Sequence, residues 1–186
     1  MNDEIIIGIS GASGVQYGIR ILEALKGLKY ETQLIVSESA KKLIEIETDF
    51  SLNEIKQLGD HVYDDDDFTA PIASGSHRSK GMIIAPCSMK SLASIAIGMS
   101  DTLISRAADV CLKEKRPLVL MVRETPLNLI HIKNMERAME AGAFILPASP
   151  AFYSKPKTLD DMIYFMAGRA LDLLNIEHKL YKRWRE

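Results

Sequence analysis

The chain has 186 residues, of which 47% are apolar and 26% are charged, and its net charge is −2. This length suits one domain with a full hydrophobic core, and the charge balance argues against a general nucleic-acid binder. No apolar run is long enough to span a bilayer, and the first residues, MNDEIII, lack the basic region of a signal peptide. The two cysteines give neither a disulfide framework nor a metal-ligand spacing, so we expect a cytoplasmic protein.

Residues 4–18 predict a buried strand, a glycine-rich turn and the start of a helix. The isoleucines among residues 5–9 are typical of a strand that is buried on both faces. Gly8, Gly11 and Gly14 are spaced three apart, which matches neither the dinucleotide pattern nor the P-loop. A turn between strand and helix directs backbone N–H groups at an anion. The turn therefore predicts a phosphate cradle for a mononucleotide-like ligand, and the alternative is a tight turn with no ligand.

Residues 33–36 predict a second strand that ends near Ser37, and residues 39–47 predict the next helix. Glu47 lies three residues after Ile44 and four after Leu43, so its carboxylate falls on or beside the apolar stripe. Spacing alone favours a last-turn residue that has frayed into solvent. The alternative is a buried carboxylate with a raised pKa, which is useful for moving protons.

A short helix over residues 51–59 precedes four consecutive aspartates at Asp64–Asp67. Clustered carboxylates can hold a divalent metal, but a solvated loop is the favoured interpretation. Residues 81–85 predict a third strand that Pro86 ends, followed by a helix with Ser88 as its N-cap. Cys87 has no histidine near it in the sequence, so we interpret it as a residue of packing or of backbone geometry.

The next helix covers residues 101–116, where Arg106 and Lys113 lie seven residues apart on one side. A fourth strand over 117–122 leads directly to Arg123 and Glu124, a pair that we interpret as a ligand clamp at the end of the strand. A helix over 128–141, closed by Gly142, precedes a fifth strand over 143–147.

A proline-punctuated loop over residues 148–156 presents Tyr153, and Thr158 begins the last long helix. Arg169 lies inside the apolar stripe of that helix, so we expect its guanidinium to have an anionic partner. The tail over 179–186 contains the chain's one tryptophan, Trp184. We expect this tail either to fray or to dock on a neighbouring subunit.

The alternation of strands and helices predicts one doubly wound α/β domain over residues 1–186, with a mostly parallel sheet. In such a sheet, ligands bind at the carboxyl ends of the strands. The turns after the first and third strands are therefore the candidate ligand site.

The segments GISGASGVQYGIR, ETDF, PIASGS, APCSMKSLA, ISRAADVCLKEKRPLVLMVRETP, ILPASPAFY and the final RW resemble the UbiX/Pad family of flavin prenyltransferases. The resemblance covers essentially the whole chain, and the block from Arg106 to Pro126 is its specific part. It implies a flavodoxin-like or Rossmann-like fold and a homo-dodecamer with active sites at subunit interfaces. It also implies transfer of a dimethylallyl group from dimethylallyl phosphate to reduced FMN, without a metal. The product would be the prenylated FMN that UbiD-type decarboxylases need, in ubiquinone synthesis or in aromatic-acid breakdown.

The resemblance also implies roles for individual residues. It assigns FMN binding to the strand-end turns, at Gly11, Ala12, Ser13, Ser37, Ser88, Met89, Lys90, Ser91 and Arg123. It assigns binding of the prenyl donor's phosphate to Arg106, Lys113, Arg123, Glu124, Tyr153 and Arg169. It assigns catalysis to Glu47, Ser13 and Tyr153, with Glu47 and Ser13 near flavin N5 and C4a. Trp184 matches a residue that closes the pocket.

Two other functions remain open at this point. One is an FMN-dependent cysteine decarboxylase, a related class that relies on a histidine after the second strand, where this chain has Ser37. The other is a non-catalytic flavin-binding subunit of a hydroxyarylic-acid decarboxylase. Glu47, Lys113, Tyr153 and Arg169 favour catalysis, because a passive carrier needs no prenyl-phosphate pocket.

Overall fold

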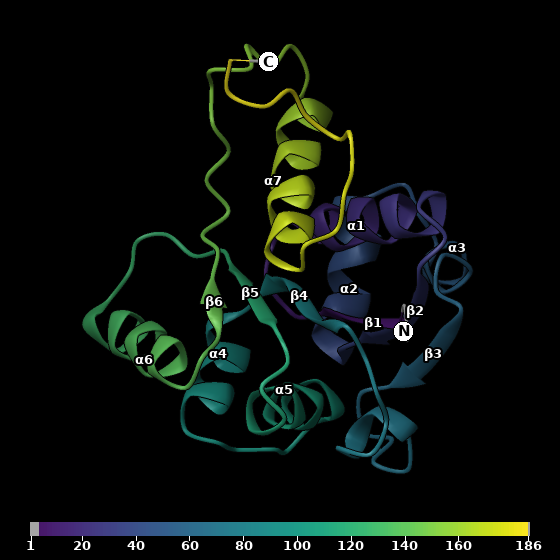
Figure 1. The fold of residues 1–186 in the computed structure, drawn as a ribbon, viewed down its shortest axis with the longest axis vertical. Helices are drawn as coiled ribbons and strands as arrows, with labels where there is room; N and C mark the ends of the chain where they lie inside the picture. The colour runs from purple at the N-terminus through teal and green to yellow at the C-terminus, as the bar shows by residue number, and fades with distance from the viewer. Residues whose placement is uncertain (1–3, 186) are drawn as a thin grey trace.

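A parallel β-sheet forms the centre of the computed structural model, which describes residues 4–185 (Figure 1). The sheet has six strands among these residues, in the order β3-β2-β1-β4-β5-β6. This is a doubly wound order, in which the chain reverses direction across the sheet between β1 and β4. The strands are β1 (Glu4–Ile9), β2 (Glu31–Val36), β3 (His61–Asp64), β4 (Gly81–Cys87), β5 (Leu118–Val122) and β6 (Phe144–Ile145).

Helices cover both faces of the sheet, which confirms the predicted α/β fold class (Figure 1). The core on one face includes residues of α1 (Gln16–Gly27), α2 (Glu38–Glu47), α3 (Leu52–Lys56) and α7 (Leu159–Leu173). The core on the other face includes residues of the 3₁₀ helix η1 (Pro71–Ala73), α4 (Met89–Ala96), α5 (Leu103–Lys113) and α6 (Leu129–Glu140).

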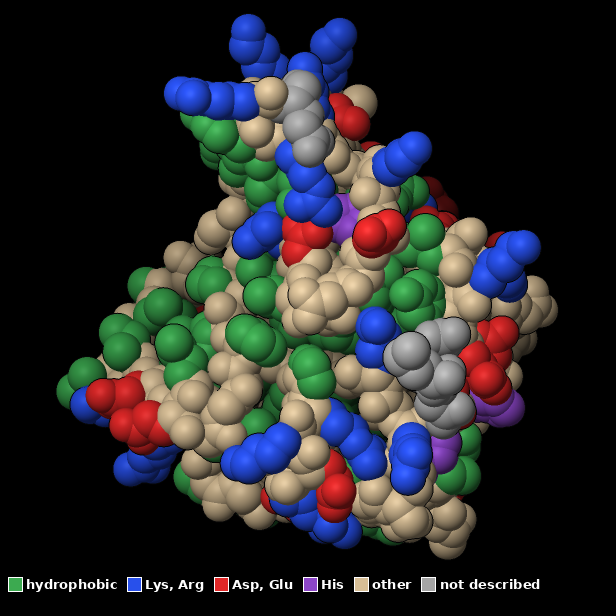
Figure 2. All heavy atoms as spheres, viewed as in Figure 1, with side chains coloured by type: hydrophobic (Ala, Val, Ile, Leu, Met, Phe, Trp, Pro, Cys, Tyr) green, Lys and Arg blue, Asp and Glu red, His purple; other side chains and the backbone are tan. Residues whose placement is uncertain are grey.

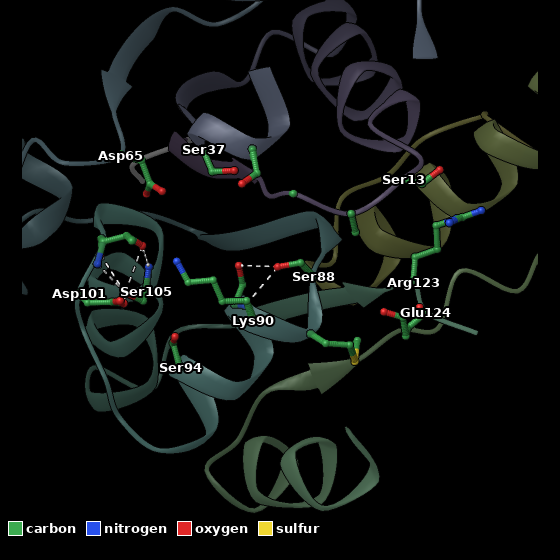
Figure 3. Close-up of a pocket in the computed structure, with 16 residues that line it drawn as sticks. Ser13, Ser37, Asp65, Ser88, Lys90, Ser94, Asp101, Ser105, Arg123 and Glu124 are labelled. Atoms are coloured by element: carbon green, nitrogen blue, oxygen red, sulfur yellow. Dashed lines mark hydrogen bonds between the residues drawn. The ribbon is translucent and has the colours of Figure 1, made fainter. Parts of the chain in front are cut away.

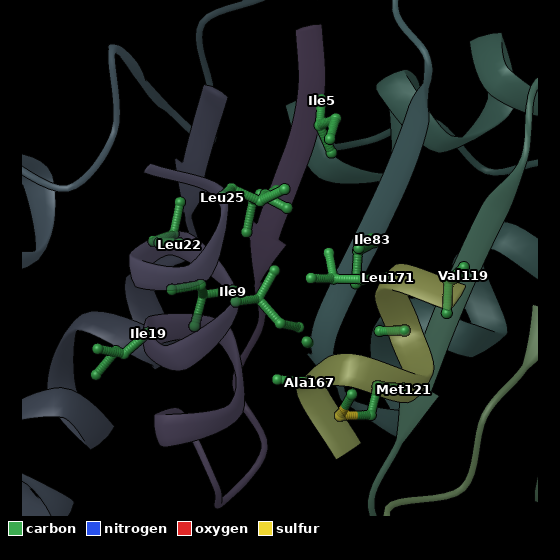
Figure 4. Packing of buried hydrophobic residues seen from close by; sticks show 14 of the residues in the cluster. Ile5, Ile9, Ile19, Leu22, Leu25, Ile83, Val119, Met121, Ala167 and Leu171 are labelled. Atoms are coloured by element: carbon green, nitrogen blue, oxygen red, sulfur yellow. The ribbon is translucent and has the colours of Figure 1, made fainter. Parts of the chain in front are cut away.

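The central strands are apolar on both sides, as the isoleucine run predicts. Ile5 and Ile9 point into one core, whereas Ile6 points into the other. Figure 4 shows the first of these cores, where side chains of β1 meet Leu22 of α1 and Leu171 of α7. Each fully buried side chain of this size contributes about 1.5–3 kcal/mol to folding. This packing fixes the strand ends, and therefore the loops that follow them.

Two strands differ from the prediction. The strand β3 was not predicted, because its four residues lie at the sheet edge and are mostly exposed, so they carry no apolar run. The strand β4 does not end at Pro86 but continues to Cys87. Its register against β5 shifts between Ile84 and Cys87, and such an irregularity accommodates a proline, which has no N–H for the ladder.

Several elements are shorter than predicted. The helix expected over 101–116 begins at Leu103, after the N-cap Thr102, and ends at Lys113. Lys115 has a positive φ of 58°, which stops the helical geometry. The helix expected over 51–59 covers only Leu52–Lys56, and the strand expected over 143–147 keeps two residues.

The C-terminal tail folds back along α7 (Figure 1). Leu180 and Tyr181 pack against the core on that side, so this part of the tail is held within its own chain. The docking of the tail on a neighbouring subunit stays a prediction, and Glu186 lies outside the described residues. Within the part of the chain that the structure describes, no helix is long and apolar enough to cross a membrane.

Candidate functional site

A cavity of about 460 Å³ opens at the carboxyl ends of β1, β2, β4 and β5. It lies where the chain reverses direction between β1 and β4, the usual ligand crevice of such sheets. Its size falls in the range of small-molecule sites, about 300–1,000 Å³. The cavity is lined by Gly11, Ala12, Ser13, Ser37, Ser39, Asp65, Ser88, Met89, Lys90, Ser91, Ser94, Asp101, Thr102, Ser105, Arg123 and Glu124.

The glycine-rich turn after β1 is packed tightly against its surroundings. A Cβ atom on Gly11 would lie 2.4 Å from the Cβ of Ser39, so only glycine allows this approach. Gly14 has a φ of +98°, a conformation that glycine adopts without strain. The buried hydroxyl of Ser10 donates to the carbonyl of Pro86 at 2.8 Å and accepts from the Ser88 N–H at 2.8 Å. The first turn is therefore joined to the turn after β4.

Three helices begin at the cavity, each with a hydroxyl side chain as its N-cap. Ser37 accepts from the Ala40 N–H at the start of α2, and Ser88 accepts from the Ser91 N–H at the start of α4. Thr102 caps α5 in the same way. Because the first N–H groups of a helix have no intrahelical acceptor, these ends carry partial positive charge. The cavity thus offers hydroxyls and positive helix ends to an anionic, hydroxyl-bearing ligand.

Charged side chains stand at both ends of the cavity (Figure 3). Asp65 and Asp101 lie at one end, Arg123 and Glu124 lie at the other, and Lys90 extends between them. The predicted clamp of Arg123 and Glu124 does reach the cavity. Two cationic side chains in a hydroxyl-rich cavity can bind a phosphate by charge-assisted hydrogen bonds.

The aspartate run is solvated as predicted at Asp64 and Asp66, which are exposed, but the prediction is wrong for Asp65. Asp65 turns inward, where its carboxylate accepts from the Ile104 N–H at 2.9 Å and its carbonyl accepts from the Leu103 N–H at 2.6 Å. Burial raises the pKa of this carboxyl, against the lowering effects of its hydrogen bonds and of Lys90. Asp65 therefore caps α5 from outside the helix. Among residues 4–185, no group of three or more histidine, cysteine or acidic side chains is placed to hold a metal ion.

Glu47 lies at the edge of this site, beside the glycine-rich turn. It is the last residue of α2, and its Oε2 accepts from the Gly14 N–H at 2.7 Å. Gln16 Nε2 donates to the Glu47 carbonyl at 2.9 Å, which holds the end of the helix. The frayed, solvated interpretation that spacing favoured is therefore wrong, because the turn supplies a hydrogen bond that sequence spacing does not reveal.

The residues predicted to bind the prenyl donor lie apart from the cavity within one protomer, except for Arg123 and Glu124. On α5, Arg106 donates from Nε to the Ala73 carbonyl at 3.0 Å and pairs with Asp109 at 3.2 Å. Lys113, at the end of the same helix, lies 3.6 Å from a carboxylate oxygen of Glu114.

Tyr153 and Arg169 form a separate group near the end of the molecule that carries the tail. The Tyr153 ring makes edge contacts with Phe165 at 5.9 Å and with Trp184 at 5.1 Å between centroids. Arg169 pairs with Asp172 at 2.9 Å, which confirms the predicted anionic partner. The Arg169 side chain is 43% exposed, however, and does not enter the cavity.

Five further lining residues escaped the sequence analysis: Ser39, Ser94, Asp101, Thr102 and Ser105. The capping pattern of Thr102 and Ser105 marks the start of a helix, but only the packing of that helix places its N-terminus at the site. Cys87 is fully buried and burial raises the pKa of its thiol to about 12, which confirms the packing role predicted for it.

The chain matches the family model described as Flavoprotein over residues 1–170. It is 51% identical to the flavin prenyltransferase UbiX of Thermoplasma acidophilum, over 97% of this chain and 99% of that protein. The crystal structure of AnUbiX (PadA1) in complex with FMN and dimethylallyl pyrophosphate superposes with a TM-score of 0.97 at 46% identity, over 98% of this chain and 97% of that chain. A dodecameric FMN-dependent UbiX-like decarboxylase from Escherichia coli O157:H7 superposes with a TM-score of 0.96 at 43% identity, covering 98% and 100%.

Proposed function

Since this chain belongs to the UbiX flavin prenyltransferases of the flavoprotein family, we propose that it joins the dimethylallyl group of dimethylallyl phosphate to N5 and C6 of reduced FMN. One observation carries the proposal: all nine residues that the resemblance assigns to FMN line a single cavity at the strand ends.

The lining residues fit the flavin nucleotide by their chemistry. Lys90 lies among the N-capping hydroxyls of α2 and α4, a setting that suits the FMN phosphate. Ser88 and Ser91 supply hydroxyls for the ribityl chain. Ser13 stands in the glycine-rich turn, on the side of Glu47 and Arg123, where we place the reactive edge of the ring.

Glu47 is proposed to handle the proton of the reaction. In the first step, the bond between the allylic carbon and phosphate breaks, a bond to flavin N5 forms, and the N5–H proton is released. In the second step, the double bond of the transferred group takes up a proton, its tertiary carbon forms the bond to C6, and the C6–H proton is lost. The Glu47 carboxylate, anchored by the Gly14 N–H, stands beside the turn where that proton leaves, and the released phosphate is the second acceptor available.

Cationic side chains are proposed to neutralise the leaving phosphate. Arg123 already reaches the cavity, so it would contact both flavin and donor. Arg106, Lys113, Tyr153 and Arg169 lie outside it, and we propose that neighbouring copies of the chain bring them to the site. A homo-dodecamer would supply such neighbours, and the E. coli relative is dodecameric.

An exposed apolar face on α6 supports assembly (Figure 2). Leu129 and Ile130 are each 69% exposed, and Ile132 and Met139 are at least half exposed. Exposed apolar side chains gathered on one helix mark an interaction surface. We propose that this face packs against another copy of the chain.

The product is proposed to serve a UbiD-type decarboxylase, to which it would be delivered as prenylated FMN. We place the reaction in the cytoplasm, because Cys87 and Cys111 are both free and buried thiols, which suit a reducing compartment.

The test is an anaerobic incubation of the purified protein with reduced FMN and dimethylallyl phosphate, followed by mass spectrometry of the extracted flavin. We expect a flavin that is heavier by one five-carbon unit, and a parallel reaction with the diphosphate identifies the preferred donor. A Glu47→Gln variant should bind FMN but yield little of the product. Unmodified flavin, with an active UbiX relative as positive control, would refute the transferase.

A second experiment separates a cofactor supplier from an accessory subunit. Extracted prenylated flavin is added to an apo decarboxylase of the UbiD type, with this protein absent. Restored decarboxylation supports the supplier, whereas activity that returns only with the protein present, together with co-purification, supports a subunit.

A further inference from the structure

One carboxylate near the end of α7 binds four donors. The Asp172 Oδ2 atom accepts from Arg169 Nη1 at 2.9 Å and from the Tyr181 hydroxyl at 2.5 Å. The Oδ1 atom accepts from Arg183 Nη2 at 2.8 Å and lies 3.1 Å from His178 Nε2. Arg169 belongs to α7, whereas the other three donors belong to the tail that follows it. The Asp172 side chain is only 16% exposed, so this network is largely shielded from water.

His178, in a defined tautomer, and Gly168 allow the tail to pack closely against α7. The Leu180 N–H donates to His178 Nδ1 at 3.2 Å, so this nitrogen accepts and the ring hydrogen lies on Nε2, facing Asp172. The His178 side chain is 1% exposed. Below the ring, a Cβ on Gly168 would lie 2.6 Å from His178 Cε1 and 2.6 Å from Tyr181 Cδ1. Only glycine leaves room for the tail here.

The seated tail contacts both donor-site residues at this end of the molecule. Arg169 is bound to Asp172 directly, and its Nη1 also lies 3.4 Å from the Tyr181 hydroxyl. Tyr153 packs edge-on against Trp184, and Phe165 contacts Tyr153 on one side and Tyr181 on the other. A tail that left α7 would therefore remove Trp184 from the Tyr153 ring and the Tyr181 hydroxyl from Arg169.

We infer that Asp172 and His178 are positioning residues for prenyl-donor binding, acting through the tail that they hold against α7. Asp172 orients the Arg169 guanidinium, and the seated tail places Trp184 against Tyr153. This inference rests on the proposed function, because it assigns Arg169 and Tyr153 to the donor. Asp172 and His178 lie outside the flavin cavity, so their loss should weaken donor binding and leave flavin binding intact.

The test compares four variants, one of which, Asp172→Glu, keeps the charge. Asp172→Asn removes the negative charge with little change of shape. Gly168→Ala displaces the tail from α7, because the added Cβ would collide with His178 and Tyr181. Asp160→Asn is the matched control, because Asp160 is on the same helix but pairs with Arg20 of α1 at 3.0 Å. Calorimetry of FMN-loaded, oxidised protein with dimethylallyl phosphate gives the donor Kd without turnover. Acrylamide quenching of the chain's one tryptophan, Trp184, reports the tail.

We expect Asp172→Asn and Gly168→Ala to raise the donor Kd about tenfold or more, because the first removes the charged contact of Arg169 and the second displaces the Tyr181 and Trp184 side chains that contact Arg169 and Tyr153. The FMN Kd should stay within about twofold of the unmodified protein, and quenching of Trp184 should increase. Asp160→Asn should change none of these values. Asp172→Glu, which keeps the charge, should recover part of the donor affinity.

Two outcomes would overturn the inference. One is unchanged donor affinity in both variants although quenching has increased, which would make the tail irrelevant to the donor. The other is an equal loss of FMN and donor affinity, which would indicate a general structural role. If the unmodified protein binds no dimethylallyl phosphate, the proposed function and the donor role fail together. Unchanged quenching of Trp184 in Asp172→Asn would contradict the inference that Asp172 holds the tail against α7, whatever the donor affinity.

Discussion

The contact between the first turn and α2 predicts the effect of adding a single methyl group. In Gly11→Ala, the new Cβ would lie 2.4 Å from Ser39 Cβ, whereas carbon atoms pack at about 3.5–4.0 Å. The turn and the start of α2 must therefore separate by about 1 Å or more. Overpacking of this kind lowers the free energy of unfolding by about 1–3 kcal/mol. Because both segments line the cavity, the FMN Kd should rise as well.

The assay is urea unfolding at one fixed protein concentration, since assembly adds concentration-dependent stability. Gly27→Ala is the matched control, because a Cβ on Gly27 meets no atom within 4 Å. That change should raise the stability by about 0.5–1 kcal/mol, as alanine restricts the unfolded chain.

A double variant tests the cause. Gly11→Ala combined with Ser39→Gly removes the atom that the new methyl group meets, so the pair should be more stable than the sum of the single effects by about 1–2 kcal/mol. Strict additivity, within about 0.5 kcal/mol, would refute the steric explanation. So would a Gly11→Ala protein as stable as the Gly27→Ala control.

Changes at three further residues have defined outcomes. Glu47→Gln keeps an acceptor for the Gly14 N–H, so the affinity for FMN should be unchanged. The rate of prenylation, measured from the mass of the flavin, should fall about 10²–10⁴-fold. Glu45→Gln, at an exposed position of the same helix, is the control. Asp65→Ala removes a cap of α5 and should lower the free energy of unfolding by about 0.5–2 kcal/mol, whereas Asp65→Asn, which retains an acceptor, should change it little. Because the pKa of the Asp65 carboxyl is raised, the stability that Asp65 contributes is lost as pH increases through that pKa. Urea unfolding of Asp65→Asn at a series of pH values should not show this loss. Hydrogen bonds from Tyr181 and Arg183 outweigh burial and hold the pKa of the Asp172 carboxyl below its usual range, so the stability that Asp172 contributes is present above about pH 4 and lost on further acidification. In Asp172→Asn, the free energy of unfolding should therefore change less with pH in that range. An unchanged pH profile would contradict the lowered pKa.

The strand-end turns could be predicted from the sequence because a parallel sheet places every such turn at one edge. Ser37, Ser88 and Arg123 each follow a strong apolar run, and knowing that the runs are parallel strands is enough to bring them together. The residues Asp101 and Ser105 could not be placed in this way. They precede or begin a helix that follows no strand, and only tertiary packing directs its N-terminus at the cavity.

The burial of single polar residues also could not be predicted from the sequence. Nothing in a run of four aspartates distinguishes Asp65, which accepts two backbone N–H groups of α5 through its side chain and carbonyl, from its neighbours. Glu47 was similarly undecided by spacing, because its partner belongs to a turn that lies 33 residues earlier in the chain. Such long-range hydrogen bonds depend on how two elements meet, which periodicity within either element does not encode.

The buried hydroxyl of Ser10 has a consequence for the thermodynamics of flavin capture. It bonds the turn after β1 to the turn after β4, so the two walls of the crevice are held at a fixed separation by the protein itself. A ligand entering such a crevice orders little backbone, and more of its contact energy remains as affinity. Ser10→Ala would change no lining side chain and would keep the bond from the Ser10 N–H to the Pro86 carbonyl, but it would remove both bonds of the hydroxyl. The flavin would then have to order more of the crevice on arrival, which would be measured as a larger entropic penalty of binding.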